Sequence, residues 1–185
     1  MYTLFIDTHY LDIVIILLKD GILVNKKEVI NKKNNSEYIF PTIVDVIDDI
    51  KLNEIIVVNG PGSFTGVRLG VTIAKTFAYI LNIPIKTITS LEVMAISSNQ
   101  LKVAFSDSNG YYIGNFDKDF NLTSDYIYLN EDEFKKINGK NYYYLTYNID
   151  IIKIYSFLKN RASINPHLVK PIYIKKIGVE IDKKS

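Results

Sequence analysis

Short apolar runs separated by polar turns fill the first thirty residues, a pattern typical of β-strands. Apolar runs occupy 2–6 and 13–18, and residues 22–29 alternate loosely between apolar and polar side chains. Asp20-Gly21 lies between the second and third segments, and Asp-Gly between apolar runs is a strong hairpin signal. The pattern therefore predicts three strands in an antiparallel meander.

Residues 36–97 predict alternating helices and strands. Ser36 can cap the first helix, Pro84 ends the second, and Thr89 to Glu92 has the spacing of a capping box. The expected elements, in order, are a helix over 36–50, a strand over 55–58, a Gly/Pro loop at 59–64, a helix over 65–81, a strand over 85–88 and a helix over 90–97.

A boundary is expected at 98–100, where a polar segment precedes a second, smaller unit. Its expected elements are strands over 101–105, 110–116, 126–129 and 142–146, and short helices over 131–137 and 151–158. The fold class predicted is therefore α/β, with mixed sheets and flanking helices, divided into an N-terminal unit at 1–98 and a reduced C-terminal unit at 99–185.

The helices over 36–50 and 65–81 are more apolar than one sheet-facing side requires. The first carries apolar residues around most of its surface. In the second, Gly66, Gly70, Ala74 and Ala78 form a stripe of small residues, and Ile73, Phe77 and Ile80 lie on the opposite side. Two readings are open: both helices are buried within this chain, or together they form a docking surface for a partner.

The docking reading assigns the partner interface to eleven residues, namely Ile39, Phe40, Ile43, Ile47, Gly66, Arg68, Gly70, Ile73, Ala74, Phe77 and Ala78. Under this reading a bulky replacement of Gly70 or Ala74 should abolish pairing and leave the fold intact. Arg68 would face an acidic group or a phosphate across the interface, or would be a solvated side chain in the first turn. The apolar helices also make a homodimer through the same surface a reasonable expectation when the partner is absent.

Composition excludes several kinds of site. The chain has no cysteine, so it can form no disulfide or thiolate metal site, and its two histidines, His9 and His167, cannot make a histidine-rich metal centre. A net charge of +2 argues against a broad basic face that grips nucleic acid alone. The longest apolar run, 13–18, is too short for a membrane span, and no targeting segment is evident, so a cytoplasmic, soluble protein is expected.

The most informative segment is residues 60–70, Gly-Pro-Gly-Ser-Phe-Thr-Gly-Val-Arg-Leu-Gly. It follows a predicted strand and enters a predicted helix, the position of a phosphate-binding loop. However, Val67 and Arg68 replace the Lys and Ser/Thr of a Walker A motif, and Thr65 replaces the third glycine of a dinucleotide fingerprint. The loop is therefore not a standard phosphate cradle.

This segment closely resembles the signature of the TsaB (YeaZ) family. Further similarity extends well over about residues 1–97 and weakly over 98–175. The further segments that resemble the family are these: Phe5 to Thr8, Asn35 to Glu37 with Pro41, Pro84 with Thr89 to Glu92, Asp107 to Tyr112, and Lys170 to Lys175. The family usually has His where Asn35 stands.

The resemblance implies the two-lobed fold of actin, Hsp70 and sugar kinases (RNase H-like). It also implies a non-catalytic role in making threonylcarbamoyladenosine in tRNA, beside the anticodon. The partner implied is the paralogue TsaD, which holds the metal and transfers the threonylcarbamoyl group, bound through the N-terminal helices. An ATPase, TsaE, joins the pair, and tRNA is reached only through the complex. No cofactor is expected on this chain alone. The resemblance also implies ATP or ADP at the partner interface. The residues expected to contact it are Gly60, Pro61, Gly62 and Ser63.

The residue chemistry agrees with a chain that has no catalytic or metal-binding residue of its own. No His-x-x-x-His occurs, and no nucleophilic triad can be argued from the sequence. Asp7 could contact a nucleotide phosphate, as in a small ATP-dependent phosphotransferase of the same superfamily, which is the alternative function. The competing role for Asp7, and for Asp107, is to bond loop amides at a strand end. A peptidase has less support.

Overall fold

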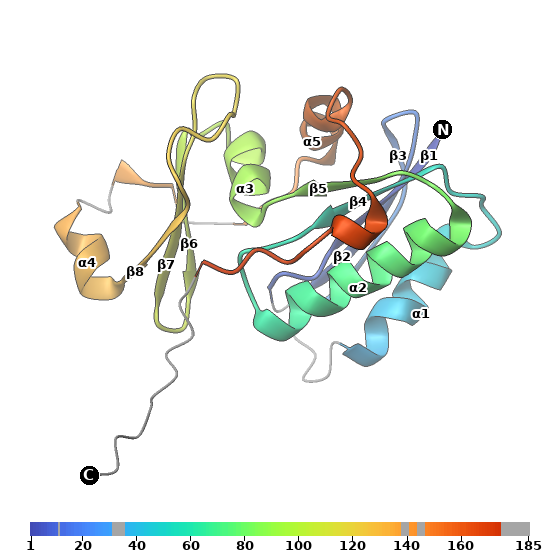
Figure 1. The fold of residues 1–185 in the computed structure, drawn as a ribbon, viewed down its shortest axis with the longest axis horizontal. Helices are drawn as coiled ribbons and strands as arrows, with labels where there is room; N and C mark the ends of the chain where they lie inside the picture. Colours follow the sequence, from blue (N-terminus) through green and yellow to red (C-terminus); the bar gives the residue numbers. More distant parts are fainter. Residues whose placement is uncertain (11, 31–35, 138–140, 144–146, 175–185) are drawn as a thin grey trace, which may run out of the picture.

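The computed structural model describes the chain except residues 11, 31–35, 138–140, 144–146 and 175–185. The described residues form a five-stranded sheet in the order β3-β2-β1-β4-β5 and a three-stranded sheet in the order β6-β7-β8 (Figure 1). The first sheet contains β1 (Tyr2–Asp7), β2 (Ile13–Lys19), β3 (Ile22–Val29), β4 (Glu54–Val58) and β5 (Ile85–Ile88). The second contains β6 (Lys102–Asp107), β7 (Gly110–Asn115) and β8 (Ile127–Asn130).

The antiparallel meander predicted at the N-terminus is confirmed. β1 pairs with β2, and β2 pairs with β3 across the Asp20-Gly21 turn. Both turn residues have positive φ, 51° and 83°, as a two-residue hairpin of this kind requires. β4 then pairs with β1, and β5 with β4, in parallel, so the buried strands β1 and β4 form the centre of the sheet.

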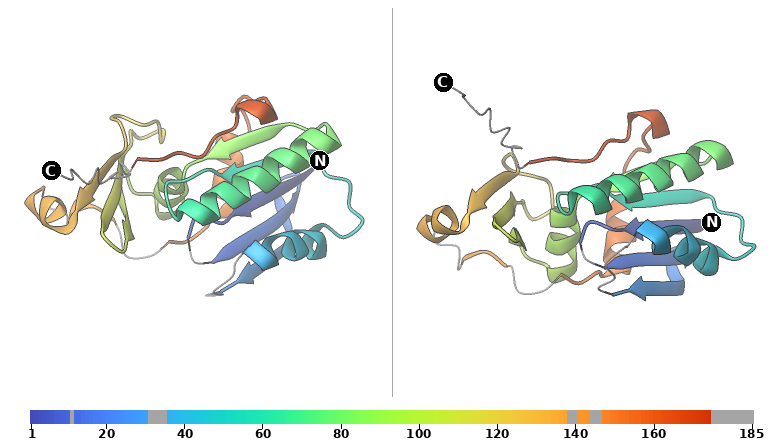
Figure 2. Two further views of the ribbon diagram at one scale, coloured as in Figure 1. Left: turned by 60° about the horizontal axis from the view of Figure 1, so that its bottom comes forward. Right: turned by 90° about the horizontal axis from the view of Figure 1, so that it is seen from below.

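Helices cover both faces of the first sheet (Figure 2). One face packs against α1 (Ser36–Ile47) and α2 (Phe64–Leu81), and the other packs against α3 (Ser90–Ser98) and α5 (Ile151–Leu158). Alternate residues of β1 serve the two sides: Leu4 and Ile6 contact the first pair of helices, and Phe5 contacts the second pair. We refer to this sheet with its four helices as the first lobe.

The second lobe is the three-stranded sheet with α4 (Glu131–Lys136), and α3 lies between the two lobes. Val93 and Ile96 of α3 pack into the first sheet, whereas Leu91, Met94 and Ala95 pack against β6 and β7. A helix buried on two opposite sides must be apolar all round, as this one is. Its predicted capping box, Thr89 with Glu92, is present.

After α5 the chain returns along the first lobe. Ile164 bridges to Ile85, η2 (Pro166–Leu168) packs on α2, and Val169 is buried in the first core. The Ile172 amide then donates to the Asn59 carbonyl at 2.8 Å. We call residues 164–174 the return segment. Thus α5 and the return segment lie on the N-terminal sheet, although they follow the second lobe in sequence.

Several element boundaries differ from those predicted. α1 ends at Ile47 instead of residue 50, because Asp48 adopts φ 46°, outside the helical region. At the expected strand 142–146, Tyr143 makes an isolated bridge to Val103, and residues 144–146 lie outside the described part. Asn35 and Lys175, which contribute to the resemblance noted above, also lie outside it.

Among the helices of the described residues, α2 alone has the length and hydropathy of a candidate membrane span. This is weak evidence, because the core helix of a soluble protein meets the same criterion. In this chain Val67, Val71 and Ala74 bury one side of α2 against the sheet.

Candidate docking face and central cavity

Helices α1 and α2 lie side by side on the outside of the first lobe (Figure 2). Both carry exposed apolar side chains. The rings of Phe40 and Phe77 meet there, with centroids 6.0 Å apart. Phe40 is 56% exposed and Ile80 is 71% exposed. Val44 on α1 and Ile73 and Ile80 on α2 lie three or four residues from these rings and are apolar too. We define the helical face as Phe40, Val44, Ile73, Phe77 and Ile80.

Other residues expected at the partner interface lie inside the lobe. Ile39, Ile43, Gly70, Ala74 and Ala78 are buried against the sheet, and Ile47 is half-buried beside them. These residues belong to the core, in agreement with the interpretation that the helices are buried within this chain. Only part of each helix remains for docking.

The stripe of small residues lets the end of β1 approach α2 closely. The Thr8 hydroxyl donates to the Gly66 carbonyl at 2.7 Å. A Cβ atom at Gly66 would collide with the Thr8 carbonyl oxygen, and one at Gly70 would collide with the Thr8 hydroxyl. The expectation that a bulky residue at Gly70 leaves the fold intact is therefore wrong, and buried Ala74 has no more room.

Arg68 is exposed and bound within the chain. Its Nε donates to the Tyr173 hydroxyl at 2.6 Å, and its guanidinium lies 3.6 Å from the centre of the Phe64 ring. Tyr173 belongs to the return segment, so Arg68 ties that segment to the start of α2. Arg68 remains exposed to solvent, and its contact with Tyr173 was not predicted from the sequence.

The glycine loop connects three parts of the first lobe. The Ser63 amide donates to the His9 carbonyl at 2.7 Å, and the Ser63 hydroxyl caps α2 through the Gly66 amide. The Ser90 hydroxyl donates to the Pro61 carbonyl at 2.7 Å. Gly60 has φ 103°, and a Cβ there would lie 2.9 Å from the Ile172 carbonyl oxygen.

Every one of the four loop residues expected at a nucleotide thus packs against this chain. Gly60 contacts the return segment, Pro61 accepts from the first turn of α3, and Gly62 and Ser63 contact the backbone of His9. The long motif at 60–70 therefore has a structural role that explains its glycines.

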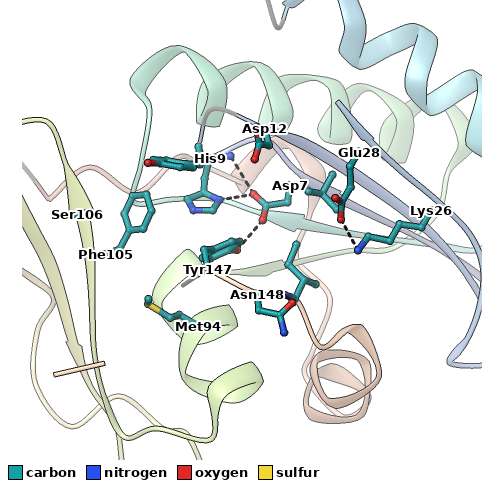
Figure 3. Close-up of a pocket in the computed structure, with 13 residues that line it drawn as sticks. Asp7, His9, Asp12, Lys26, Glu28, Met94, Phe105, Ser106, Tyr147 and Asn148 are labelled. Atoms are coloured by element: carbon teal, nitrogen blue, oxygen red, sulfur yellow. Dashed lines mark hydrogen bonds and ion pairs between the residues drawn. The ribbon is translucent and has the colours of Figure 1, made fainter. Parts of the chain in front are cut away.

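Asp7, at the end of β1, is buried, and both of its carboxylate oxygens are occupied (Figure 3). Oδ1 accepts from the His9 amide at 3.1 Å and lies 2.6 Å from His9 Nδ1, and Oδ2 accepts from the Tyr147 hydroxyl at 2.7 Å. The bond to the His9 amide is the loop-amide role expected of a strand-end Asp.

Electrostatics keep this carboxylate ionised. Burial raises the pKa of Asp7. The His9 imidazole and the hydrogen bonds from His9 and Tyr147 lower it by more than burial raises it, so the pKa lies below its usual value of 3.8. Burial, and then the charge of Asp7, raise the pKa of Tyr147 well above its usual value, so its phenol remains a donor. A phosphotransferase would need a carboxylate here that is free to reach phosphate or metal.

These residues line a cavity of about 350 Å³ between the two lobes. Asp7, Asp12, Lys26 and Glu28 supply its charged groups from the first lobe. Aromatic walls come from Tyr10, Phe105 and Tyr147, and apolar ones from Val14, Met94 and Ile149. Within the described residues, no group of three or more Asp, Glu or His is placed to hold a metal ion.

Asp107, the other acidic candidate, stabilises a turn. Its Oδ1 accepts from the Asn109 amide at 2.8 Å and from the Tyr128 hydroxyl at 2.7 Å. His167 lies on η2, where its ring meets Tyr79, far from His9 in the fold. The contacts of His9 and Tyr147 with Asp7 were not predicted from the sequence. The two-residue spacing from Asp7 to His9 was the available signal for the first, and Tyr147 is 140 residues away.

Comparison with solved structures shows the fold. YeaZ from Pseudomonas aeruginosa superposes with a TM-score of 0.73 at 15% identity, over 93% of this chain and 99% of that one. A structure described as an uncharacterized protein with similarity to peptidase YEAZ from Pseudomonas aeruginosa gives 0.75 at 15% identity, over 94% and 99%. The expected α/β fold with two sheets and flanking helices is thereby confirmed, and it is the fold of YeaZ.

Sequence comparison adds the family. A family model described as TsaD, tRNA N6-adenosine threonylcarbamoyltransferase, matches residues 29–105. The tRNA threonylcarbamoyladenosine biosynthesis protein TsaB of Bacillus subtilis (strain 168) is 40% identical over 100 residues, 51% of this chain and 44% of that protein. The TsaB protein of Buchnera aphidicola subsp. Schizaphis graminum (strain Sg) is 31% identical over 146 residues, 65% and 70% of the two chains.

The fold defines a two-lobed α/β protein with the architecture of YeaZ. The chain belongs to the TsaB family. Its match spans less than half the length of the Bacillus subtilis relative.

Proposed function

We propose that this chain is a non-catalytic subunit of the complex that makes N6-threonylcarbamoyladenosine in tRNA beside the anticodon, and that it pairs with a TsaD-like transferase. The observation that carries this proposal is the helical face, together with family membership. An exposed apolar patch on two packed helices is typical of a protein interface.

The proposed interface is narrower than the one expected from sequence. Phe40, Ile73 and Phe77 remain from that set, since they lie at the helical face, and Val44 and Ile80 join them. Arg68 lies at the edge, already held by Tyr173. A TsaE-like ATPase and tRNA would join through the complex, in the cytoplasm, with ATP or ADP held at the partner interface and not by this chain alone. In the absence of its partner the chain would form a homodimer through the same face.

Co-purification with the TsaD-like protein of the same organism tests this proposal. Phe40→Glu places a charge at the centre of the helical face and should weaken binding by tenfold or more, on the order of a hot-spot loss. Leu122→Glu is the matched control, because Leu122 is 42% exposed in the second lobe, away from α1 and α2. Urea unfolding should show both variants folded.

Equal binding by wild type and Phe40→Glu, with both folded, would remove the helical face from the interface. Sedimentation of the isolated chain separately tests the homodimer, which Phe40→Glu should dissociate. The phosphotransferase alternative predicts ATP turnover by the purified chain that is lost in Asp7→Asn. The occupied oxygens of Asp7 argue against that outcome.

A further inference from the structure

The Nε2 atom of His9 is buried at the central cavity and takes no part in the proposed docking face. His9 is 1% exposed, and its Nε2 finds no hydrogen-bond partner among the residues that the structure describes. The ionised Asp7 carboxylate can only accept, so Nδ1 carries the ring proton in the 2.6 Å contact. In the neutral ring Nε2 is therefore an acceptor, and a buried acceptor left unpaired is costly.

Aromatic rings surround this nitrogen. The His9 ring lies 5.1 Å from the Phe105 ring and 4.4 Å from the Tyr147 ring, centre to centre. Tyr10 closes the group with an edge contact to Phe105 at 5.2 Å. Figure 3 shows Nε2 turned away from Asp7, towards the side of the cavity walled by Phe105. Ring faces of this kind attract cations.

The charged groups of the cavity favour a cation as well. Asp7, Asp12 and Glu28 supply three carboxylates, whereas Lys26 is the one lysine in the lining. The Lys26 ammonium is paired with Glu28 at 2.5 Å, so Asp7 and Asp12 are the carboxylates in excess of the lysine charge. A phosphate or carboxylate entering here would meet an excess of negative charge, and an ammonium would be stabilised by it.

We propose that this cavity binds a small organic ammonium, primary or secondary, that carries an apolar body. Its N–H would donate to His9 Nε2, and its charge would lie against the rings of Tyr10 and Phe105, in a cavity whose lining also carries three carboxylates. The apolar body would pack on Met94 and Ile149, which line the same space. A volume of about 350 Å³ suits such a molecule. This site is separate from the helical face, so the proposal stands independently of docking.

Calorimetry on the full chain with three matched probes tests the charge preference. Phenethylamine hydrochloride should bind, 2-phenylethanol should bind about tenfold more weakly, and phenylacetate should not bind. The three share one apolar body, so the difference reports the ammonium. Absence of phenethylamine binding, or phenylacetate binding as tight, would overturn the proposal.

Two variants place the ligand in this cavity without touching buried His9. Tyr10→Ala removes an aromatic wall that is 42% exposed, and should weaken phenethylamine binding roughly 3- to 30-fold. Asp12→Asn removes one charge and should weaken it about fivefold. Tyr79→Ala, at a residue 63% exposed on α2, is the control and should bind as wild type does. Equal affinity in all three variants would overturn the assignment to the cavity.

Nitrogen NMR of the imidazoles gives a direct readout of the acceptor. Phenethylamine should shift the His9 Nε2 resonance, while the exposed His167 serves as an internal reference that stays in place. A shift at His167 with none at His9 would place the amine elsewhere and reject the role of Nε2.

Discussion

Thr8 and Gly66 are 58 residues apart in sequence, yet the Thr8 hydroxyl donates to the Gly66 carbonyl at 2.7 Å. The bond joins the end of β1 to the first turn of α2, and Gly70 receives the same threonine side chain one turn later. No side chain larger than hydrogen fits at either glycine without displacing β1. This contact explains the small residues of the motif by packing inside the lobe.

Gly70→Ala should destabilise the chain by about 1–3 kcal/mol in urea unfolding, because the new methyl group collides with Thr8. The helix propensity of alanine, about 1 kcal/mol better than that of glycine, acts in the opposite direction and should not overcome the collision. Thr72→Ala, at an exposed position of α2, is the control and should be neutral or slightly stabilising. A Gly70→Ala variant as stable as wild type would show that β1 can retreat from α2.

Tyr147→Phe removes the donor to Asp7 Oδ2 and leaves a buried carboxylate oxygen without that bond. The free energy of unfolding should fall by about 1.5–3 kcal/mol, the usual contribution of a hydrogen bond to a charged group. Tyr79→Phe, on the exposed side of α2, should change it little. A loss at Tyr147→Phe no larger than at Tyr79→Phe would contradict the importance of this bond.

The stability contributed by Asp7 should depend on pH in acid. The folded pKa of Asp7 lies below 3.8, so its contribution is complete above that value and is lost as pH falls through the folded pKa. The stability difference between wild type and Asp7→Asn should therefore shrink as unfolding is measured below pH 3.8. A difference that stays constant down to the lowest measurable pH would show that the carboxylate gains nothing from His9 and Tyr147.

A buried ion pair joins the parallel strands β4 and β5. Lys86 Nζ lies 2.8 Å from Glu54 Oε2, with side chains 10% and 6% exposed. Glu54→Gln should lower the free energy of unfolding by about 3–5 kcal/mol, because the buried Lys86 ammonium loses its counter-charge. The double variant Glu54→Leu with Lys86→Met removes both charges and should be close to wild type in stability. Glu131→Gln breaks an exposed pair with Lys135 and should have no measurable effect. Equal losses from the single and double buried variants would contradict this account.

Local signals in the sequence predicted much of the fold. Asp20-Gly21 and the Thr89–Glu92 box mark a hairpin and a helix start through backbone requirements that hold wherever they occur. The end of α1 was missed because Asp48 takes a left-handed conformation that its residue type does not demand.

The side-chain contacts of the site could not be predicted from the sequence, because they join segments that are far apart along the chain. The spacing of Gly66, Gly70, Ala74 and Ala78 shows that something approaches α2 closely, but only the fold shows that it is β1 and its sheet. Tyr147 reaches Asp7 across the boundary between lobes, and no local pattern predicts that pairing.

The return segment makes the first lobe discontinuous along the chain. Val169 completes the core beneath α2, and α5 covers Phe5, Ile16 and Ile56 on the other side. A ribosome that has released only the first hundred residues has therefore produced a sheet with α1, α2 and α3 present, whose two faces still lack the contacts of residues 151–172. Since such non-local contacts form late and slowly, the first lobe should reach its native packing only after residues 151–172 have left the ribosome.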